Sequence, residues 1–409
     1  MTLGARTLLA LSAMFALSAC AAPTLDPGTD SPAVPITAPG STAYGGPVGG
    51  LASEPGPAAA STAQAPATPG TPAAPATAGA ARTPAPVTIS FAGDVHFERH
   101  VAALLRRPDG LAELRPLLGA ADISIVNLET SITTRGTAQP KQFTFRAPPS
   151  ALDTLAAAGV DVVGMANNHA VDFGPVGLTD TLAAKDASPV PVIGIGTDAA
   201  AAFAPAVIDV RGTSVAVIAS TQYPDFTART FPAADGRPGV AVNVDNTRLV
   251  AAVRAARSRF DVVVVFLHWG TERQNCPDAA QFATAAALER AGADVIVGGH
   301  QHRVLGAGWL GRAYVGYGLG NFIWWLKTKT DADAASGVLT VEIDPALVAA
   351  RAAIPRDRWP TLSPVVRSAR YAPLTISAVD GIPRPAVAPA ARLAAWEAAR
   401  ACTTLRGTP

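Results

Sequence analysis

Apolar runs alternate with amphipathic stretches along the chain from Val87 onward. The apolar runs are short and rich in β-branched residues, as in strands, and helix-period segments such as residues 98–105 and 150–156 lie between them. Four early strands are predicted, at Val87–Ala92, Ile123–Val126, Val160–Met165 and Val192–Ile195. This alternation of helix and strand favours an α/β fold.

The pattern changes in the second half of the chain. Residues 206–219 predict a hairpin around Arg211-Gly212, and residues 247–297 then return to alternating helix and strand. Within that stretch Val262–Phe266 is apolar throughout, as expected for a strand covered on both faces. After Gly299 the pattern becomes mostly β.

Together these patterns predict one α/β domain over residues 86–345, with two sheets packed together and helices outside. We expect residues 346–409 to be a C-terminal extension that packs on this domain. Whether that extension forms a subdomain of its own stays open, and no internal repeat is evident.

The first twenty residues predict a secretion signal. Arg6 supplies a positive charge before the apolar run Thr7–Ala16, which is too short to span a bilayer comfortably. The run ends in Leu17-Ser18-Ala19-Cys20, which resembles a bacterial lipobox, in which the cysteine becomes the lipid-bearing N-terminus. We therefore expect an extracytoplasmic protein anchored to the membrane through lipid on Cys20. An ordinary cleaved signal peptide with a chance cysteine is the alternative.

Residues 21–85 consist almost entirely of Ala, Pro, Thr, Gly and Ser. Such a segment buries too little apolar surface to offset its ordering entropy, so we expect a disordered tether between membrane and domain. The net charge of the whole chain is +1, which gives no argument for nucleic acid as a partner.

Cys276 and Cys402 are the two cysteines outside the signal segment. An exported domain permits a disulfide, but the sequence does not show whether the two Cα atoms come within bridging distance. Pairing therefore stays open. A disulfide would tie the C-terminal helix to the loop after His268.

Chemically active residues follow the predicted strands directly. The motifs are Gly93-Asp94-Val95-His96, Asn127-Leu128-Glu129, Asn167-Asn168-His169 with Asp172, His268-Trp269-Gly270 with Glu272, and Gly299-His300-Gln301-His302. Ligand sites of α/β sheets collect at the carboxyl ends of strands, so this shared placement favours one common site. Imidazole and carboxylate are the ligands of divalent transition metals, which predicts a metal site.

Each motif alone has a simpler explanation. Asp94 and His96 fit a turn in which the carboxylate accepts backbone N–H groups, and Asn167-Asn168-His169 fits a loop held by Asx hydrogen bonds. A single buried histidine such as His268 is more often satisfied by a carbonyl. The joint occurrence of the motifs favours the metal site over these explanations.

The motifs together resemble the bacterial capsule-synthesis family called CapA or PgsA, linked to poly-γ-glutamate, which in turn looks like a branch of the calcineurin-like metallophosphoesterases. The resemblance covers about Val87 to Trp325 and includes Gly320-Asn321-Phe322 as a sixth motif. It implies a metallophosphoesterase-like fold, a two-sheet β-sandwich flanked by helices.

The resemblance also implies a set of metal ligands. They are Asp94, His96 and His302 for one ion, Asn168, His268 and His300 for a second, and Glu129 between the two. Glu129 stands where phosphoesterases have an aspartate, so the number of ions, one or two, stays open. The cofactor is one or two divalent ions, with Mn²⁺, Fe²⁺ and Zn²⁺ all compatible with the ligand types.

Beyond the metals, the resemblance implies catalytic roles for His169 as general acid or anion-stabilising group and for Asp172 as the carboxylate that orients it. Glu272, Asn321 and Arg303 are expected to contact the substrate or support the ligands. Cations that could hold an anionic substrate, each also explained as surface charge, are Arg99, Lys141, Arg146, Arg273 and Arg303. Trp269, Phe322, Trp324 and Trp325 are expected to pack in the core or at the rim.

The leading hypothesis is a lipid-anchored metal-dependent hydrolase of this capsule family that acts on poly-γ-glutamate or a related envelope polymer. The alternative is a non-catalytic subunit that binds the anionic polymer or a synthase complex at the membrane. A general phosphodiesterase or nucleotidase is weaker, because Glu129 and His268-Trp269-Gly270 favour the capsule branch. The sequence leaves the metal, the true substrate and the oligomeric state open.

Overall fold

The structure is a computed structural model that describes residues 85–326, 330–355, 358 and 363–409. The predicted signal peptide with Cys20 and the predicted tether lie outside the described residues, except for Ala85. In the part of the chain that the structure describes, no helix is long and apolar enough to cross a membrane.

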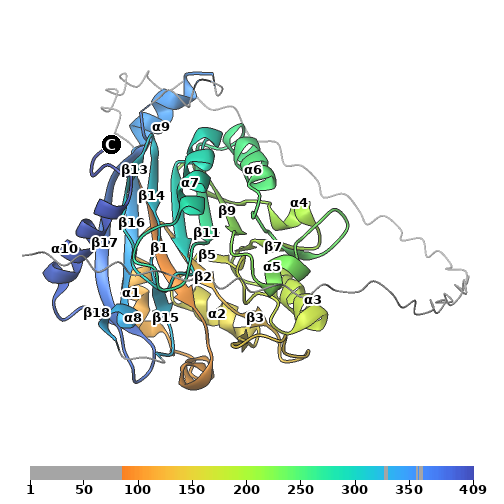
Figure 1. Cartoon of the computed structure of the whole chain (residues 1–409). Helices are drawn as coiled ribbons and strands as arrows, with labels where there is room; N and C mark the ends of the chain where they lie inside the picture. Colours follow the sequence, from red (N-terminus) through yellow and green to blue (C-terminus); the bar gives the residue numbers. More distant parts are fainter. Residues whose placement is uncertain (1–84, 327–329, 356–357, 359–362) are drawn as a thin grey trace, which may run out of the picture. The chain divides into compact units, whose positions relative to one another are not determined.

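An eight-stranded sheet and a six-stranded sheet form the centre of the fold (Figure 1). The larger has the order β18 (Pro383–Pro385), β17 (Val366–Ile376), β16 (Ala335–Ile343), β1 (Val87–Val95), β2 (Ile123–Leu128), β5 (Val162–Gly164) and β6 (Val192–Ile193), with β15 (Asn321–Ile323) also on β1. The smaller has the order β13 (Ala307–Leu310), β14 (Ala313–Gly316), β12 (Val295–Gly299), β11 (Val262–His268), β9 (Thr213–Thr221) and β8 (Ala206–Val210).

The two sheets pack face to face through buried apolar side chains. Phe91 of β1 and Phe266 of β11 are both buried, and their ring centroids lie 6.4 Å apart. All seven residues of β11 are buried, which agrees with its apolar sequence. The predicted α/β fold with two packed sheets is therefore confirmed.

Helices lie outside the sheets. The α-helices are α1 (Arg115–Leu118), α2 (Ser150–Ala157), α3 (Gly174–Asp186), α4 (Ala199–Ala202), α5 (Phe226–Thr230), α6 (Thr247–Arg257), α7 (Ala279–Ala291), α8 (Asp331–Ala334), α9 (Pro345–Ala352) and α10 (Pro389–Ala398). The 3₁₀ helices include η1 (Arg99–Arg106), η2 (Ala112–Leu114) and η4 (Ala399–Cys402), and two small sheets pair β3 (Ser131–Ile132) with β4 (Arg146–Ala147) and β7 (Ile195–Gly196) with β10 (Gly239–Val240). Figure 1 shows α6 and α7 side by side next to the smaller sheet.

Parallel pairing brings the carboxyl ends of the central strands to one edge. In the larger sheet β1, β2, β5 and β6 are parallel, and in the smaller sheet β9, β11, β12 and β14 are parallel. Asp94 of β1 lies opposite Asn127 of β2, and His268 of β11 lies opposite Gly299 of β12. The motifs that follow these strands therefore meet where the two sheets face each other.

Two local predictions were wrong in detail. The helix expected near residues 98–105 is the 3₁₀ helix η1, and the strand expected at Val192–Ile195 is divided between β6 and β7, which belong to different sheets. Gly194 makes this division: its φ is +85°, and a Cβ there would lie 2.5 Å from the Cβ of Ala166.

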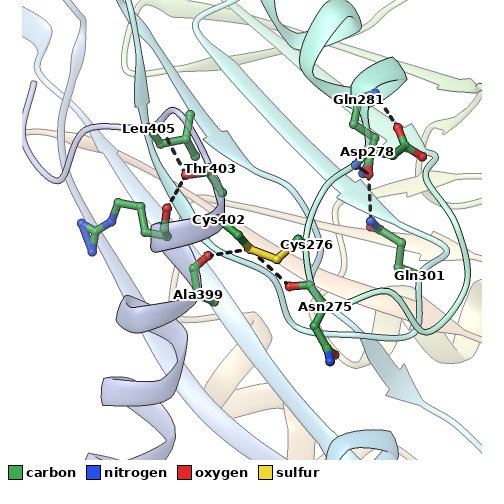
Figure 2. Close-up of a disulfide and its surroundings, with 10 residues drawn as sticks. Asn275, Cys276, Asp278, Gln281, Gln301, Ala399, Cys402, Thr403 and Leu405 are labelled. Atoms are coloured by element: carbon green, nitrogen blue, oxygen red, sulfur yellow. Dashed lines mark hydrogen bonds between the residues drawn. A yellow bond between two sulfur atoms is a disulfide. The ribbon is translucent and has the colours of Figure 1, made fainter. Parts of the chain in front are cut away.

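The C-terminal segment, residues 389–406, crosses from one sheet to the other. Trp396 of α10 stacks on Tyr371 of β17 at 4.9 Å, and Arg406 forms a two-bond bridge with Trp309 of β13. Between these contacts Cys402 forms a disulfide with Cys276, with the Cα atoms 5.7 Å apart (Figure 2). The structure thus decides the pairing that the sequence left open.

Candidate metal centre

Asp94 lies at the centre of the site and is fully buried at the end of β1. Its Oδ1 accepts the side-chain N–H of Asn127 at 2.8 Å, and its Oδ2 accepts the backbone N–H of His300 at 2.9 Å. The side chain is so close to β12 that a Cβ on Gly299 would lie 2.3 Å from Oδ1. Glycine at position 299 is therefore required for the two sheets to approach each other here.

Glu129, directly after β2, is fully buried and neither of its carboxylate oxygens has a hydrogen-bond partner among the described residues. His268 Nε2 lies 3.5 Å from Oε1, and His169 Nε2 lies 3.8 Å from it. Burial, and next the nearby negative charge of Asp94, raise the pKa of Glu129 to about 8. Burying a carboxylate without a hydrogen-bond partner destabilises the folded state unless a cation binds to it.

His268 and His300 face this carboxylate. His268 Nε2 lies 2.7 Å from Oδ1 of Asn168 and 3.0 Å from Nδ1 of His300, while Nε2 of His300 has no partner among the described residues. Burial lowers the pKa of His268 to about 4 and the pKa of His300 well below its ordinary value. Both rings are therefore neutral at neutral pH, which is the form that binds metals.

Two groups of side chains converge closely enough to hold ions. Ligand atoms of Glu129, His268 and His300 lie within 4.8 Å of one another, and so do those of Asp94, Glu129 and His302. Glu129 belongs to both groups, as the resemblance implied for a residue between two ions. The cluster has more acceptors than donors, so its residues fit one or two divalent cations.

Among the expected histidine and carboxylate ligands, His96 is the one that lies outside both groups in the described part of the chain. Its Nδ1 accepts the backbone N–H of Glu98 at 3.0 Å, and its Nε2 faces the backbone N–H of Trp325 at 3.5 Å. A cation beside either nitrogen would meet the positive end of an N–H dipole. The ring instead packs between Phe145, stacked at 4.7 Å, and Trp324, edge-on at 4.0 Å.

The two histidines after β12 have left-handed backbones, with φ of +88° at His300 and +53° at His302. Such conformations cost a non-glycine residue on the order of 1–3 kcal/mol and collect at functional sites. They turn the chain sharply enough for both rings to reach the same cluster. Nδ1 of His302 lies 2.7 Å from Oδ1 of Asn321, so Asn321 contacts one of the predicted ligands.

His169 and Asp172 form a buried pair at the edge of the cluster. His169 Nδ1 lies 2.5 Å from Oδ2 of Asp172, which also accepts the backbone N–H of Phe145 at 2.7 Å. Lys141 Nζ contacts Oδ1 of Asp172 at 2.7 Å and Asp225 at 3.3 Å. Lys141 is therefore part of this internal ion network. This position differs from the prediction that it is one of the cations that could hold an anionic substrate.

A pocket opens over the cluster. Its lining includes His169 and His302, the expected contacts Glu272 and Asn321, and the aromatic residues Phe143, Phe145, Trp324 and Trp325. Arg303 is held by Asp333 at 2.8 Å and by the carbonyl of His302 at 2.8 Å, so it supports the histidine loop. Trp269 and Phe322 are buried in the core, as expected.

Three further residues contribute to the site without having been assigned a role. Asn127 donates to Asp94 and lies 3.1 Å from His268 Nδ1, and it was visible within the second motif. Tyr223 lies against His300, with ring centroids 3.9 Å apart, and it follows the end of β9, so the strand-end rule could have found it. Phe145 stacks between His96 and His169, and no sequence signal identifies it.

Comparisons with known proteins agree with these motifs. The family model described as "Bacterial capsule synthesis protein PGA_cap" matches residues 88–324. "PGA biosynthesis protein CapA" of Bacillus subtilis is 28% identical over 254 residues, 60% of this chain and 66% of the relative. "Capsule biosynthesis protein CapA" of Bacillus anthracis is 28% identical over 258 residues, 60% of this chain and 62% of that protein. The match thus spans slightly less than two thirds of these relatives.

Solved structures found in the comparison are only distantly similar to this chain. A phosphatase from Mycoplasma pneumoniae is 14% identical with a TM-score of 0.43, covering 71% of this chain and 94% of that one. A 5′-nucleotidase from Candida albicans is 8% identical with a TM-score of 0.38, covering 77% of this chain and 58% of that one. These scores add nothing to the assignment of the site. The family match covers more than half of the chain, and the chain belongs to the bacterial capsule synthesis protein family PGA_cap.

Proposed function

We propose that this chain is a metal-dependent hydrolase that cleaves poly-γ-glutamate, or a related envelope polymer with a carboxylate on each unit. The observation that carries the proposal is the orphaned carboxylate of Glu129, which lies beside two neutral histidines and the His169–Asp172 pair. A scaffold without chemistry gains nothing from a buried carboxylate that has no hydrogen-bond partner. The choice of polymer is supported by the resemblance of the motifs to a family linked to poly-γ-glutamate and by the name of the Bacillus subtilis relative, a PGA biosynthesis protein.

The same residues would hold the metal. Asp94, Glu129 and His302 would hold one ion, and Glu129, His268 and His300, with Asn168 nearby, would hold a second. When bound, such an ion supplies Lewis-acid polarisation of the scissile group. The ligand set accepts Mn²⁺, Fe²⁺ or Zn²⁺.

His169 supplies the proton chemistry. Its Nδ1 is held by Asp172, so Nε2 is directed toward Glu129 and the pocket. The carboxylate of Asp172 stabilises the positive ring that protonation creates, and Nε2 can then deliver that proton to the leaving nitrogen of an amide. Phe145 stacks on the ring at 4.1 Å and keeps water from one of its faces.

The N-terminal residues support a location for this activity. The lipobox-like Leu17-Ser18-Ala19-Cys20 supports a location outside the cytoplasm, with attachment to the membrane through lipid on Cys20. Mass spectrometry of the N-terminal peptide from the membrane fraction checks this: a lipid-modified Cys20 supports it, and an unmodified peptide that starts after another residue contradicts it.

The experiment that tests the function combines metal analysis with cleavage. The full chain is purified without added metal, and its metal content and its release of amine from poly-γ-glutamate are measured beside Glu129→Gln and His169→Ala. We expect one to two ions per chain, lost in Glu129→Gln, and cleavage that is lost in His169→Ala although its metal remains. Absence of stoichiometric metal after reconstitution with Mn²⁺ or Zn²⁺ would overturn the proposal, and so would full cleavage by His169→Ala.

A further inference from the structure

Arg273 has a backbone conformation that a non-glycine residue rarely adopts. It lies in the loop between β11 and α7, and its φ is +62°. The strain is maintained by a hydrogen bond from its backbone N–H to the carbonyl of Gln301, at 2.8 Å. Gln301 stands between the two histidines of the metal cluster, so the backbone of Arg273 is tied directly to the site.

The loop around Arg273 is fixed at both of its ends. At its start Gly270 has φ of +81°, and a Cβ there would lie 2.6 Å from the Gln301 side chain. At its end Asp278 and Gln281 form a capping box that opens α7, and Gln281 also accepts the side-chain N–H of Gln301 at 3.0 Å. The disulfide of Cys276 then ties the loop to the C-terminal segment (Figure 2).

This construction presents two charged side chains to the pocket over the metal cluster. Glu272 and Arg273 both line that pocket and both are exposed. Within residues 85–326 and the other described ranges, neither side chain has a hydrogen bond or an ion pair. Arg303 is not one of the residues that line this pocket, and Asp333 and the His302 carbonyl hold its guanidinium.

We infer that Glu272 and Arg273 together recognise one carbon atom of the substrate that carries both an N–H group and a carboxylate. A guanidinium fork matches a carboxylate through two parallel hydrogen bonds, and a carboxylate accepts an N–H. A γ-linked glutamyl unit has this chemistry, since its α-carbon bears the amide N–H and a free carboxylate. An α-linked unit uses that carboxyl in its backbone, and a phosphate polymer lacks the N–H.

This inference deepens the proposed function and rests on it for the identity of the polymer. It makes Arg273 and Glu272 specificity-determining residues for γ-linked over α-linked glutamyl chains. It also gives the disulfide a role at the site, because Cys276 lies three residues after Arg273 and helps to hold its loop in place.

The test compares binding of γ-linked and α-linked glutamyl oligomers of equal length by titration calorimetry. The protein is the full chain carrying His169→Ala, loaded with Mn²⁺, so that cleavage does not interfere. We expect the γ-linked oligomer to bind more tightly, Arg273→Ala to weaken that binding by about tenfold, and Arg273→Lys to recover part of it. Arg290→Ala, an equal charge change at an exposed position of α7, is the matched control and leaves binding unchanged.

The remaining variants separate recognition from folding. Glu272→Gln reduces the preference for the γ-linked oligomer. Cys276→Ser with Cys402→Ser weakens binding, and its effect does not add to that of Arg273→Ala if the disulfide acts through the arginine. Thermal unfolding of each variant confirms that the folded protein is being titrated.

The outcomes distinguish this inference from the proposed function. Equal binding of the two oligomers, no binding of either, or unchanged binding by Arg273→Ala would overturn the inference. Selective binding without cleavage by the unmutated protein would leave the inference standing and overturn the hydrolase. If Arg273→Ala cleaved poly-γ-glutamate with the same KM as the unmutated protein, the hydrolase would stand and the inference would be overturned.

Discussion

A buried carboxylate lies near each end of β12, and the two differ in their hydrogen-bond partners. Before its first residue lies Asp294, which accepts Arg257 Nη1 at 2.5 Å, Arg351 Nη1 at 2.8 Å and the backbone N–H of Val263 at 2.9 Å. Near its last residue lies Glu129, whose two oxygens have no hydrogen-bond donor in the described part of the chain.

The pKa values of Asp294 and Glu129 shift in opposite directions for this reason. Burial raises the pKa of Asp294, but the charges of Arg257 and Arg351 outweigh it and the net pKa is lowered. Burial raises the pKa of Glu129 as well, and Asp94 adds to the effect. The charge of Asp294 is therefore balanced by arginines of the fold itself, whereas a bound cation would be needed to balance the charge of Glu129. Burial alone does not mark a functional carboxylate, and the missing partner does.

We expect the largest effect on the free energy of unfolding from a substitution of Asp294, at the start of β12. Asp294→Asn removes the buried negative charge that Arg257 and Arg351 both contact, which should lower the free energy of unfolding by about 3–5 kcal/mol. Urea unfolding at pH 7 measures this loss. A change below about 1 kcal/mol would show that the arginine cluster does not stabilise the fold.

In metal-free protein, Glu129→Gln should raise the free energy of unfolding, whereas Asp294→Asn should lower it. The pKa of Glu129 is raised from 4.5 to about 8, so the stability that this group contributes is full below about pH 4.5 and is lost as pH rises through about 8. Glutamine does not ionise, so the variant does not lose this stability. As the pH rises, its free energy of unfolding should exceed that of the unmutated protein by a growing amount, a few kcal/mol at most. Urea unfolding of metal-stripped protein at pH 5, 6.5 and 8 checks this. Glu272→Gln, at an exposed position, should show no such gain, and a pH-independent difference at Glu129 would contradict the prediction.

The stabilisation that a bound metal gives the folded protein should distinguish the ligands from neighbouring residues. At an ion concentration about 100 times its dissociation constant, binding should stabilise the folded protein by about 2.7 kcal/mol. His300→Ala should lose most of this gain, because its Nε2 is the orphaned nitrogen of the cluster. His96→Ala should keep it, because its nitrogens face backbone N–H groups. Thermal unfolding with and without Mn²⁺ measures both, and loss of the gain in His96→Ala would return that residue to the ligand set.

The smallest effect is at the surface. Arg211 holds Asp122 through two contacts of 2.7 Å, and its hydrogen bond, opposed by burial, lowers the pKa of Asp122 to about 2. The stability from this pair is present above about pH 3.8 and is lost as pH falls through about 2. Because the pair is solvent-exposed, Arg211→Ala should cost less than about 1 kcal/mol at pH 7. Urea unfolding at pH 7 and pH 2 checks this, and a difference that persists at pH 2 would assign it to packing.

The strand-end rule predicted much of the site because it depends only on local patterns. Asp94, Glu129, His268 and His300 each follow an apolar run, and parallel pairing makes such ends meet. The rule did not indicate that the N–H groups of Glu98 and Trp325 face the ring of His96, because these contacts depend on how loops pack, so its role as a ligand stays a prediction.

Other features depend on tertiary contacts that no local pattern carries. The partners of Asp294 come from α6 and α9, which are far apart in the sequence, and neither arginine follows a recognisable motif. The break of the predicted strand at Gly194 was likewise hidden, since an isolated glycine does not reveal which sheet each half joins.

The place of β1 in the larger sheet has a consequence for chain synthesis. This strand, the first that the structure describes, pairs along one side with β16, so that Val87 lies opposite Ile343. A growing chain that has just passed His302 already holds every candidate ligand, yet it lacks the neighbour that covers this side of β1. A chain that ends before β16 therefore contains all the candidate ligands but lacks a strand that β1 needs, so the ability to bind metal should arise only after β16 (Ala335–Ile343) has been synthesised.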